Sequence, residues 1–312
     1  MLDNTILVTG ATGTQGGATV QALLQLGYRV RVLVRSSSSP ASQKLSKLGA
    51  EMALGDFDDI SSLETAVQGV NAIFLNVSPS LEDPEAETRH ANNVITAAAQ
   101  AGGSVQTLVY NSTVLTGQHH SFPSWETWND FARQYWLSKA ANEDRVRASG
   151  ISNWTILRPC TFMTNYLQPL APFFFPELLS QGVFRTALGP ETPTMLIDPD
   201  DIGRFAAAAL TQPARFHGQE IDLGAEALTP PEIAMELTRA SGRNVKAEYI
   251  PQHKVKELIP QSHIISAQTF FNERSAQIDA LALEKRWGLT LTKFAEFLDS
   301  HQNDVKKSFT VQ

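Results

Sequence analysis

The chain has 312 residues, of which 42% are apolar, so it can form one large domain plus a smaller second part. Charged residues make up 18% and the formal net charge is −7, which argues against a disordered chain and against direct nucleic acid binding. One cysteine excludes an internal disulfide, and no run of 18 apolar residues is present to span a bilayer. We expect a cytoplasmic protein with no membrane part, and we leave nuclear entry open.

The first half of the sequence alternates short β-branched runs with helical stretches. We expect strands at residues 5–10, 29–35, 51–54, 71–77, 107–112 and 154–159. We expect helices between them, at about 15–26, 41–48, 60–69, 85–101 and 125–149. Repeated β-α-β units with apolar strands predict a Rossmann-type α/β fold, a doubly wound parallel sheet with helices on both faces.

The regular alternation of strands and helices stops after Pro159, where prolines and aromatic residues become frequent. Thr229 is the expected N-cap of a later helix. Beyond residue 198 we expect helices at 199–213 and 229–242, strands at 219–224 and 245–250, and mostly helix thereafter.

These patterns predict two interleaved parts. The Rossmann domain covers 1–158, and 196–224 returns to it. A smaller C-terminal α/β substrate-binding part covers 159–195 and 225–312, and we expect it to pack over the carboxyl edge of the sheet.

A glycine-rich loop follows the first strand, with the sequence G-A-T-G-T-Q-G-G. Gly10 permits a tight turn, Gly13 lets the backbone approach a pyrophosphate, and Gly16 allows close packing of helix and strand. The spacing is G-x-x-G-x-x-G, not the G-x-G-x-x-G of standard dehydrogenases. A flexible turn would be the alternative, but the position between a strand and a helix favours dinucleotide binding.

The end of the second strand indicates which dinucleotide. NAD-specific folds place an acidic residue there, roughly 20 residues past the glycines, to bind the ribose 2′-hydroxyl. This chain has Arg35 followed by Ser36 and Ser37, which suit a 2′-phosphate, so NADP(H) is favoured over NAD(H). The alternative is an ordinary surface cation. Asp56 and Phe57, just after the third strand, are placed to touch the adenine.

Four segments carry a family resemblance: GATGTQGG, VRVLVR, LGAEMALGDFDD and WTILRPCTFMTNY. Together they resemble the NmrA-like family of atypical short-chain dehydrogenase/reductases, over roughly residues 4–215. That family includes NADP(H)-binding redox sensors and transcription co-regulators as well as reductases. The resemblance implies cofactor contacts at Gly10, Thr12, Gly13, Thr14, Gln15, Arg35, Asp56, Phe57, Asn76, Val77, Ser78, Lys139, Pro159, Cys160, Thr161 and Phe162.

The predicted helix at 125–149 contains Tyr135 and Lys139, four residues apart and so on one helix face. In short-chain dehydrogenases such a lysine favours loss of the tyrosine proton and holds the nicotinamide ribose, while the tyrosine exchanges a proton with the substrate oxygen. Ser112, with its neighbour Thr113, offers the assisting hydroxyl. A surface pair is the alternative. Many NmrA-like sensors keep only the lysine, so the tyrosine favours an enzyme.

Several other residues keep two interpretations. Cys160 is either a small packing residue or a redox group near the nicotinamide, and His119 and His120 are either exposed or at the edge of a pocket. No His, Cys, Asp or Glu cluster has metal-site spacing, so no metal is expected. An apolar substrate pocket or ordinary core packing would each explain the aromatic residues Trp125, Trp128, Trp136, Phe173, Phe174 and Phe175.

The sequence therefore favours an NADP(H)-dependent oxidoreductase that acts on a small apolar or aromatic carbonyl, quinone or enone, with Tyr135 as acid/base. The alternative is a catalytically silent NADP(H) sensor or co-regulator that binds a protein partner such as a transcription factor. A homodimer is left open.

Overall fold

The computed structural model describes residues 4–122, 125–274 and 276–310. The chain divides into two compact units. The first lies within 1–116, 135–158 and 199–222, and the second within 117–134, 159–198 and 223–312. Among the described residues, no helix combines the length and the apolar character needed to cross a membrane. Substrate binding by the second part stays a prediction.

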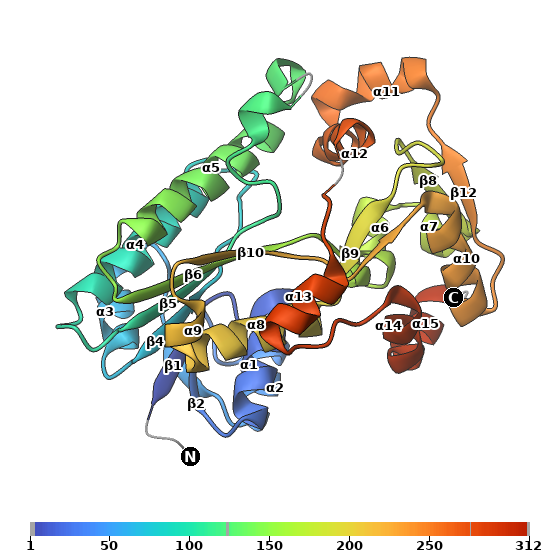
Figure 1. The fold of residues 1–312 in the computed structure, drawn as a ribbon. Helices are drawn as coiled ribbons and strands as arrows, with labels where there is room; N and C mark the ends of the chain where they lie inside the picture. Colours follow the sequence, from blue (N-terminus) through green and yellow to red (C-terminus); the bar gives the residue numbers. More distant parts are fainter. Residues whose placement is uncertain (1–3, 123–124, 275, 311–312) are drawn as a thin grey trace. The chain divides into compact units, whose positions relative to one another are not determined.

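The first unit is built on a seven-stranded sheet in the described part of the chain (Figure 1). Its order is β10-β6-β5-β4-β1-β2-β3, and the pairings β1–β2, β1–β4, β2–β3, β4–β5 and β5–β6 are all parallel. The strands are β1 Thr5–Val8, β2 Arg29–Val34, β3 Glu51–Leu54, β4 Ala72–Leu75, β5 Thr107–Asn111, β6 Asn153–Pro159 and β10 Gln219–Leu223.

This order confirms the doubly wound Rossmann prediction. The chain runs from β1 outward to β3, then returns to β4 and runs outward on the other side. The loops after β1 and β4 therefore part at a switch point, which is where open α/β sheets bind ligands. The central strands β1, β4 and β5 are buried at every residue, because helices cover both faces of the sheet, and this explains their continuous apolar runs.

Helices cover the sheet of the first unit. On one face α1 packs against α8, and on the other α3 packs against α4 (Figure 1). The first pair is close because Gly203 of α8 faces Ala18: a Cβ at Gly203 would lie 2.6 Å from the Ala18 carbonyl. The helices are α1 Thr14–Gln25, α2 Pro40–Lys47, α3 Ile60–Val67, α4 Ala86–Gln100, α5 Asp130–Arg147, α8 Pro199–Thr211 and α9 Pro213–Phe216.

Helix α5 begins later than predicted. The side-chain oxygen of Asn129 accepts a hydrogen bond from the Ala132 amide at 2.8 Å, so Asn129 caps the helix and Asp130 is its first residue. The expected start at residue 125 was wrong, since Trp125–Thr127 form a separate short 3₁₀-helix.

The second unit contains two small sheets in the described part of the chain. In one, β9 pairs in parallel with β7 and antiparallel with β11, and in the other β12 pairs in parallel with β8. The predicted strand at 245–250 is thus confirmed as β12. The strands are β7 Thr161–Phe162, β8 Val183–Thr186, β9 Thr194–Ile197, β11 Glu226–Leu228 and β12 Lys246–Tyr249.

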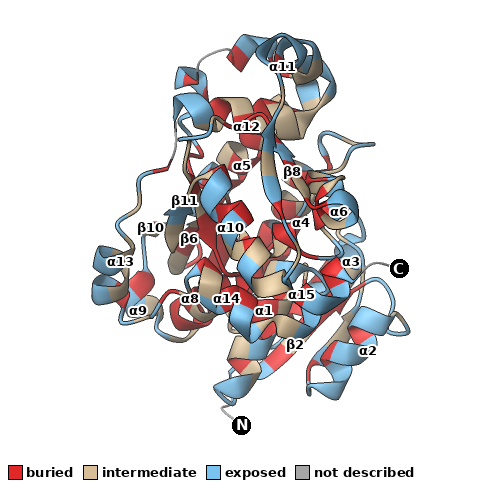
Figure 2. Ribbon diagram, turned by 90° about the vertical axis from the view of Figure 1, so that its right-hand side faces the viewer, coloured by how far each residue is buried: buried red, intermediate tan, exposed pale blue. Residues whose placement is uncertain are grey.

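Short helices fill the rest of the second unit. Thr229 caps α10 as predicted, in a capping box with Glu232. An aromatic core that includes Tyr166, Phe184 and Phe294 supports the small sheets, whereas α11 is mostly exposed (Figure 2). The helices are α6 Ala171–Phe174, α7 Leu178–Gln181, α10 Pro230–Ser241, α11 Gln252–Leu258, α12 His263–Glu273, α13 Ala280–Trp287, α14 Phe294–Ser300 and α15 Gln302–Phe309.

Candidate functional site

The loop between β1 and α1 folds tightly on itself. Gly10 has a positive φ of 60°, and its carbonyl oxygen accepts the amide of Gly13 at 3.0 Å. A Cβ at Gly10 would lie 2.8 Å from Asn76, and one at Gly16 would collide with the backbone of Gly10 and Ala11. Both positions therefore require glycine.

Helix α1 begins directly after this loop with no capping side chain. Its N-cap residue is Gly13, and no acidic residue lies in the first turn. The first N–H groups of a helix have no partner within the helix and carry a partial positive charge. This end of α1 therefore suits an anion such as a pyrophosphate. Of the predicted contacts here, Thr12, Gly13 and Thr14 are exposed and Gln15 is half-buried.

Thr9 joins the ends of β1 and β4. Its hydroxyl donates to the Asn76 carbonyl at 3.1 Å, and the Asn76 amide donates to the Thr9 hydroxyl at 2.8 Å. Asn76 and Val77 are buried, whereas Ser78 is exposed. The structure thus brings the predicted contacts Gly10 and Asn76 side by side at the switch point. Thr9 was not predicted, although a threonine directly after a buried strand was a usable signal.

The end of β2 presents an exposed cation. Arg35 is exposed and makes no hydrogen bond or ion pair with the residues that the structure describes. By contrast, Arg31 on the same strand pairs with Glu51 at 2.8 Å. Beside Arg35, the Ser36 hydroxyl lies 2.9 Å from that of Ser38. Arg35 is therefore available to an anion, as a 2′-phosphate site requires.

The segment after β3 holds the predicted adenine contacts. The Asp56 carboxylate accepts the Asp58 amide at 3.0 Å, and the Phe57 ring stacks on His90 at 5.1 Å between centroids. Asp58 bonds to Arg89, which together with His90 lowers the pKa of Asp58 to about 2. These contacts fix the backbone around Phe57, while Asp56 remains exposed.

Lys139 lies in a buried ion pair. Its ammonium is 2.7 Å from Oε1 of Glu87 on α4, and the two side chains are 6% and 1% exposed. The other oxygen of Glu87 accepts the Ser138 hydroxyl at 2.5 Å. Burial alone would lower the pKa of Lys139, but contact with Glu87 and the neighbouring Tyr110 and Tyr135 together outweigh burial, so this pKa lies above its usual value. Lys139 is therefore a fixed cation.

Two tyrosines flank this cation. The rings of Tyr110 on β5 and Tyr135 on α5 each lie 5.7 Å from the Lys139 ammonium. Tyr110 is fully buried, and burial raises its pKa. Its hydroxyl oxygen accepts a hydrogen bond from the side-chain amide of Asn142 at 3.3 Å. Tyr135 is half-buried, and no described residue hydrogen-bonds to its hydroxyl. Tyr135 is the better placed of the two to exchange a proton with a small molecule.

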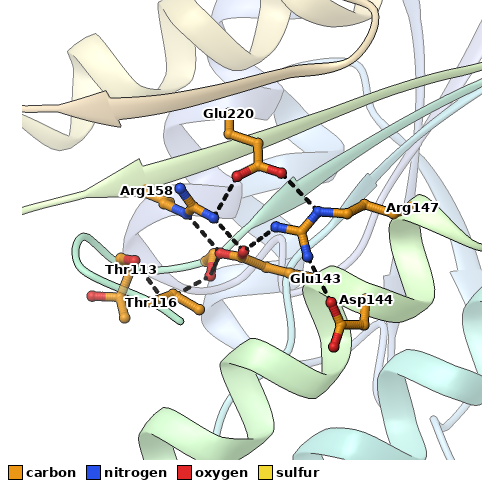
Figure 3. A network of polar contacts seen from close by, with 8 residues as sticks. Thr113, Thr116, Glu143, Asp144, Arg147, Arg158 and Glu220 are labelled. Atoms are coloured by element: carbon orange, nitrogen blue, oxygen red, sulfur yellow. Dashed lines mark hydrogen bonds and ion pairs between the residues drawn. The ribbon is translucent and has the colours of Figure 1, made fainter. Parts of the chain in front are cut away.

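Ser112 belongs to a different cluster. Its hydroxyl donates to the Glu143 carboxylate at 2.7 Å. Figure 3 shows the rest of this network: Glu143 pairs with Arg147 at 2.8 Å and Arg158 at 2.5 Å, and both arginines reach Glu220. This network ties α5 to β6 and β10.

The consequence for Ser112 is that its hydroxyl already has an anionic acceptor. No hydrogen bond between described residues joins Ser112 to Tyr135 or Lys139. Burial would lower the pKa of Arg158, but the hydrogen bond to Glu143 and the negative charge of Glu143 raise it. Arg158 therefore stays charged and paired with Glu143. The catalytic role of Ser112 stays a prediction.

The predicted contacts after β6 lie in the second unit. Cys160 is buried, and its amide donates to the Leu223 carbonyl at 2.9 Å. Thr161 and Phe162 form β7 and are half-buried, and Pro159, the last residue of β6, is buried. Their contact with a cofactor stays a prediction.

The predicted aromatic residues fall into separate places. His119 is buried against His120 and Trp125, at 4.1 Å and 5.0 Å between ring centroids, and burial lowers its pKa. The exposed-loop interpretation is thus wrong for His119, whereas His120 is exposed. Trp125 and Trp128 pack together in the same cluster, with their ring centroids 5.5 Å apart.

The remaining aromatic residues lie partly in the first unit and partly in the second. Trp136 is buried and its ring meets Tyr135 edge-on at 5.7 Å. Phe173 is exposed, whereas Phe175 is buried and stacks on Tyr166 at 5.1 Å in the core of the second unit.

Glu87 is the main site residue that the sequence analysis missed. The buried residues of α4 include Glu87, Ala91, Val94 and Ala98, which share one helix face. A carboxylate on an apolar face needs a partner, and that signal was available in the sequence.

Within the described residues, no group of three or more His, Cys, Asp or Glu side chains could hold a metal ion.

Comparison with known proteins gives consistent matches. A model of the NmrA-like family matches residues 2–301. The (4-alkanoyl-5-oxo-2,5-dihydrofuran-3-yl)methyl phosphate reductase of Streptomyces griseus is 34% identical over 243 residues, which cover 78% of this chain and 76% of the relative.

Two solved structures share the architecture. An NADPH-dependent quinone oxidoreductase from Escherichia coli is 25% identical, with a TM-score of 0.71 over 95% of this chain and 98% of that one. NmrA, a negative transcriptional regulator solved in complex with NADP, is 19% identical, with a TM-score of 0.76 over 100% of this chain and 99% of that one. Given the family match over nearly its whole length, the chain belongs to the NmrA-like family.

Proposed function

We propose that this protein is an NADP(H)-dependent reductase of small apolar or aromatic carbonyls, quinones or enones, with Tyr135 as the proton donor. One observation carries the proposal. Tyr135 is half-buried beside the fixed cation Lys139, and its hydroxyl has no hydrogen-bond partner among the described residues. That arrangement leaves the hydroxyl available to a substrate oxygen.

The cofactor assignment rests on two features of the first unit. The glycine loop and the uncapped start of α1 suit a pyrophosphate, because a side chain at Gly10 or Gly16 would collide with the loop. Directly after β2, Arg35 offers an exposed guanidinium that has no polar partner among the described residues, which suits a 2′-phosphate. The NADPH-dependent quinone oxidoreductase supports this choice, whereas NmrA is solved in complex with NADP and with NAD. NADPH, when bound, supplies the hydride.

The residues of α5 handle the proton. Tyr135 donates its hydroxyl proton to the substrate oxygen, so hydride and proton together convert a carbonyl to an alcohol, and water then reprotonates Tyr135. An ammonium has three N–H bonds, and the contact of Lys139 with Glu87 uses one of them. The others can donate to ribose hydroxyls, while the charge stabilises the tyrosinate.

The substrate class rests on the relatives. The Streptomyces reductase is named for an alkanoyl-oxo-dihydrofuran phosphate, and the Escherichia coli enzyme for quinones. Both names describe conjugated carbonyl compounds. We infer that this chain accepts the same broad class, in a pocket that admits a small apolar or aromatic molecule.

A second function has one observation in its favour. Ser112 donates its hydroxyl to Glu143, so it assists Tyr135 less directly than in short-chain dehydrogenases. Together with the likeness in fold to the regulator NmrA, this supports an NADP(H) sensor that binds a protein partner without turnover. The sensor requires a partner affinity that changes with cofactor state.

The test is NADPH oxidation by the wild type and by Tyr135→Phe over a panel of quinones, aldehydes, ketones and enones, after fluorescence has established NADPH binding. Tyr28→Phe is the matched control, because Tyr28 is also half-buried and lies outside the site. We expect turnover to fall by about two orders of magnitude or more in Tyr135→Phe only, with binding retained. Unchanged turnover in Tyr135→Phe would refute the proton-donor role, and tight binding without turnover favours the sensor.

A further inference from the structure

We propose that Glu87 is the positioning residue of Lys139: its carboxylate holds the lysine ammonium charged and in one orientation for the cofactor. The inference rests on the proposed function, because Lys139 acts there as the cation beside Tyr135 and the ribose. Glu87 itself touches neither reacting group.

Both oxygens of the Glu87 carboxylate contact α5, one through an ion pair and the other through a hydrogen bond. One lies 2.7 Å from the Lys139 ammonium, and the other accepts the Ser138 hydroxyl at 2.5 Å. Because Ser138 and Lys139 are neighbours on one helix, the two contacts fix the carboxylate in a single orientation. The first turn of α4 is thereby attached to the helix that carries the catalytic pair.

The surroundings make the charge of Glu87 necessary. Lys139 faces Glu87 from α4, Tyr110 from β5 and Tyr135 from its own helix, and of these Glu87 is the carboxylate. Burial opposes a charged lysine, and Glu87 is the largest of the contributions that together reverse that effect, so the pKa of Lys139 lies above its usual value. Without a counter-charge, a buried ammonium loses its proton at a lower pH, since buried lysines titrate several pH units below exposed ones.

Glu87→Gln keeps the size of the side chain and removes the charge. The amide can still bond to Ser138, so the variant isolates the electrostatic effect on Lys139. We expect Lys139 to deprotonate within the accessible alkaline range in Glu87→Gln. A neutral amine donates weakly to ribose hydroxyls, and NADPH affinity should therefore fall as the pH rises.

The experiment is a fluorescence titration with NADPH from about pH 6 to about pH 10. Glu85→Gln is the matched control, because Glu85 is exposed, lies two residues away and carries the same charge. The wild type and Glu85→Gln should show the same pH dependence. In Glu87→Gln, the NADPH Kd should rise at least about tenfold more between pH 7 and pH 9 than in the wild type. This extra rise should vanish in a Lys139→Met background.

A uniform loss of affinity, with an unchanged pH dependence, would show that Glu87 is only structural. If Glu87→Gln does not fold, Glu87→Asp replaces it: the shorter carboxylate should give a smaller shift in the same direction, and no shift overturns the proposal. If no substrate is turned over but the pH effect on NADPH binding is present, the reductase assignment fails and the role of Glu87 stands. A wild type that does not bind NADPH overturns both.

Discussion

Replacing Arg35 with alanine should separate the two nicotinamide cofactors. Arg35 directly follows β2, is exposed, and makes no polar contact with the described residues, so its removal should leave stability unchanged. Its proposed role is to bind the 2′-phosphate, which NADPH has and NADH lacks. The expected effect is therefore confined to NADPH.

The size of the effect follows from exposure. Hydrogen bonds to charged groups contribute about 1.5–3 kcal/mol, and an exposed guanidinium belongs at the lower end because water screens it. A loss of about 1.5 kcal/mol corresponds to about a tenfold rise in the NADPH Kd. The NADH Kd should change by less than about twofold, and the NADPH effect should shrink at high salt.

The assay is a fluorescence titration of both cofactors against the wild type, Arg35→Ala and Arg29→Ala. Arg29 is the control, since it is also exposed, lies at the opposite end of β2 and carries the same charge. An equal loss of affinity for NADPH and NADH, or the same loss of NADPH affinity in Arg29→Ala, would mean that Arg35 contributes only to the overall electrostatic potential of the surface. Either result would refute a 2′-phosphate site at this strand end.

Three further predictions concern the fold. Gly203→Ala should lower the free energy of unfolding by about 1–3 kcal/mol in urea, because the new Cβ meets the Ala18 backbone at 2.6 Å; an unchanged midpoint would contradict this packing. Asn129→Ala should lower the free energy of unfolding by about 1 kcal/mol in the same assay, because α5 loses its N-terminal cap. Asp58→Asn should make the stability of the fold less dependent on pH between about pH 4 and pH 2. The bond to Arg89 lowers the pKa of Asp58 from 3.8 to about 2, so the contribution of Asp58 to stability is present above pH 4 and is lost as the pH falls toward 2. Thermal unfolding across that range should show a smaller slope in the variant.

The elements of the first unit were predictable because their signals are local and agree with one another. The apolar runs of β1, β4 and β5 require burial on both faces, and a glycine loop directly after β1 fits one topology. The start of α5 was missed for an equally local reason. Nothing in residues 125–128 interrupts a helical pattern, and the cap at Asn129 decides where the helix begins.

The site was less predictable where its contacts join distant segments. The spacing of Tyr135 and Lys139 is readable within one helix, but the partner of Lys139 lies on α4, 52 positions earlier, and no spacing rule connects them. Ser112 shows the reverse case. Its position after β5 suggested assistance to Tyr135, yet Glu143 competes for its hydroxyl, and a carboxylate is the stronger acceptor.

Helix α5 thus carries two buried charged systems, and together they indicate which group is left for chemistry. Lys139 is neutralised by Glu87, and Glu143 is neutralised by Arg147 and Arg158. Both carboxylates are therefore already engaged by cations of α5 and β6. Beside Lys139, the half-buried Tyr135 keeps a hydroxyl without a partner among the described residues. The charge pairing that holds α5 in place therefore supports the proposal that Tyr135 is the proton donor.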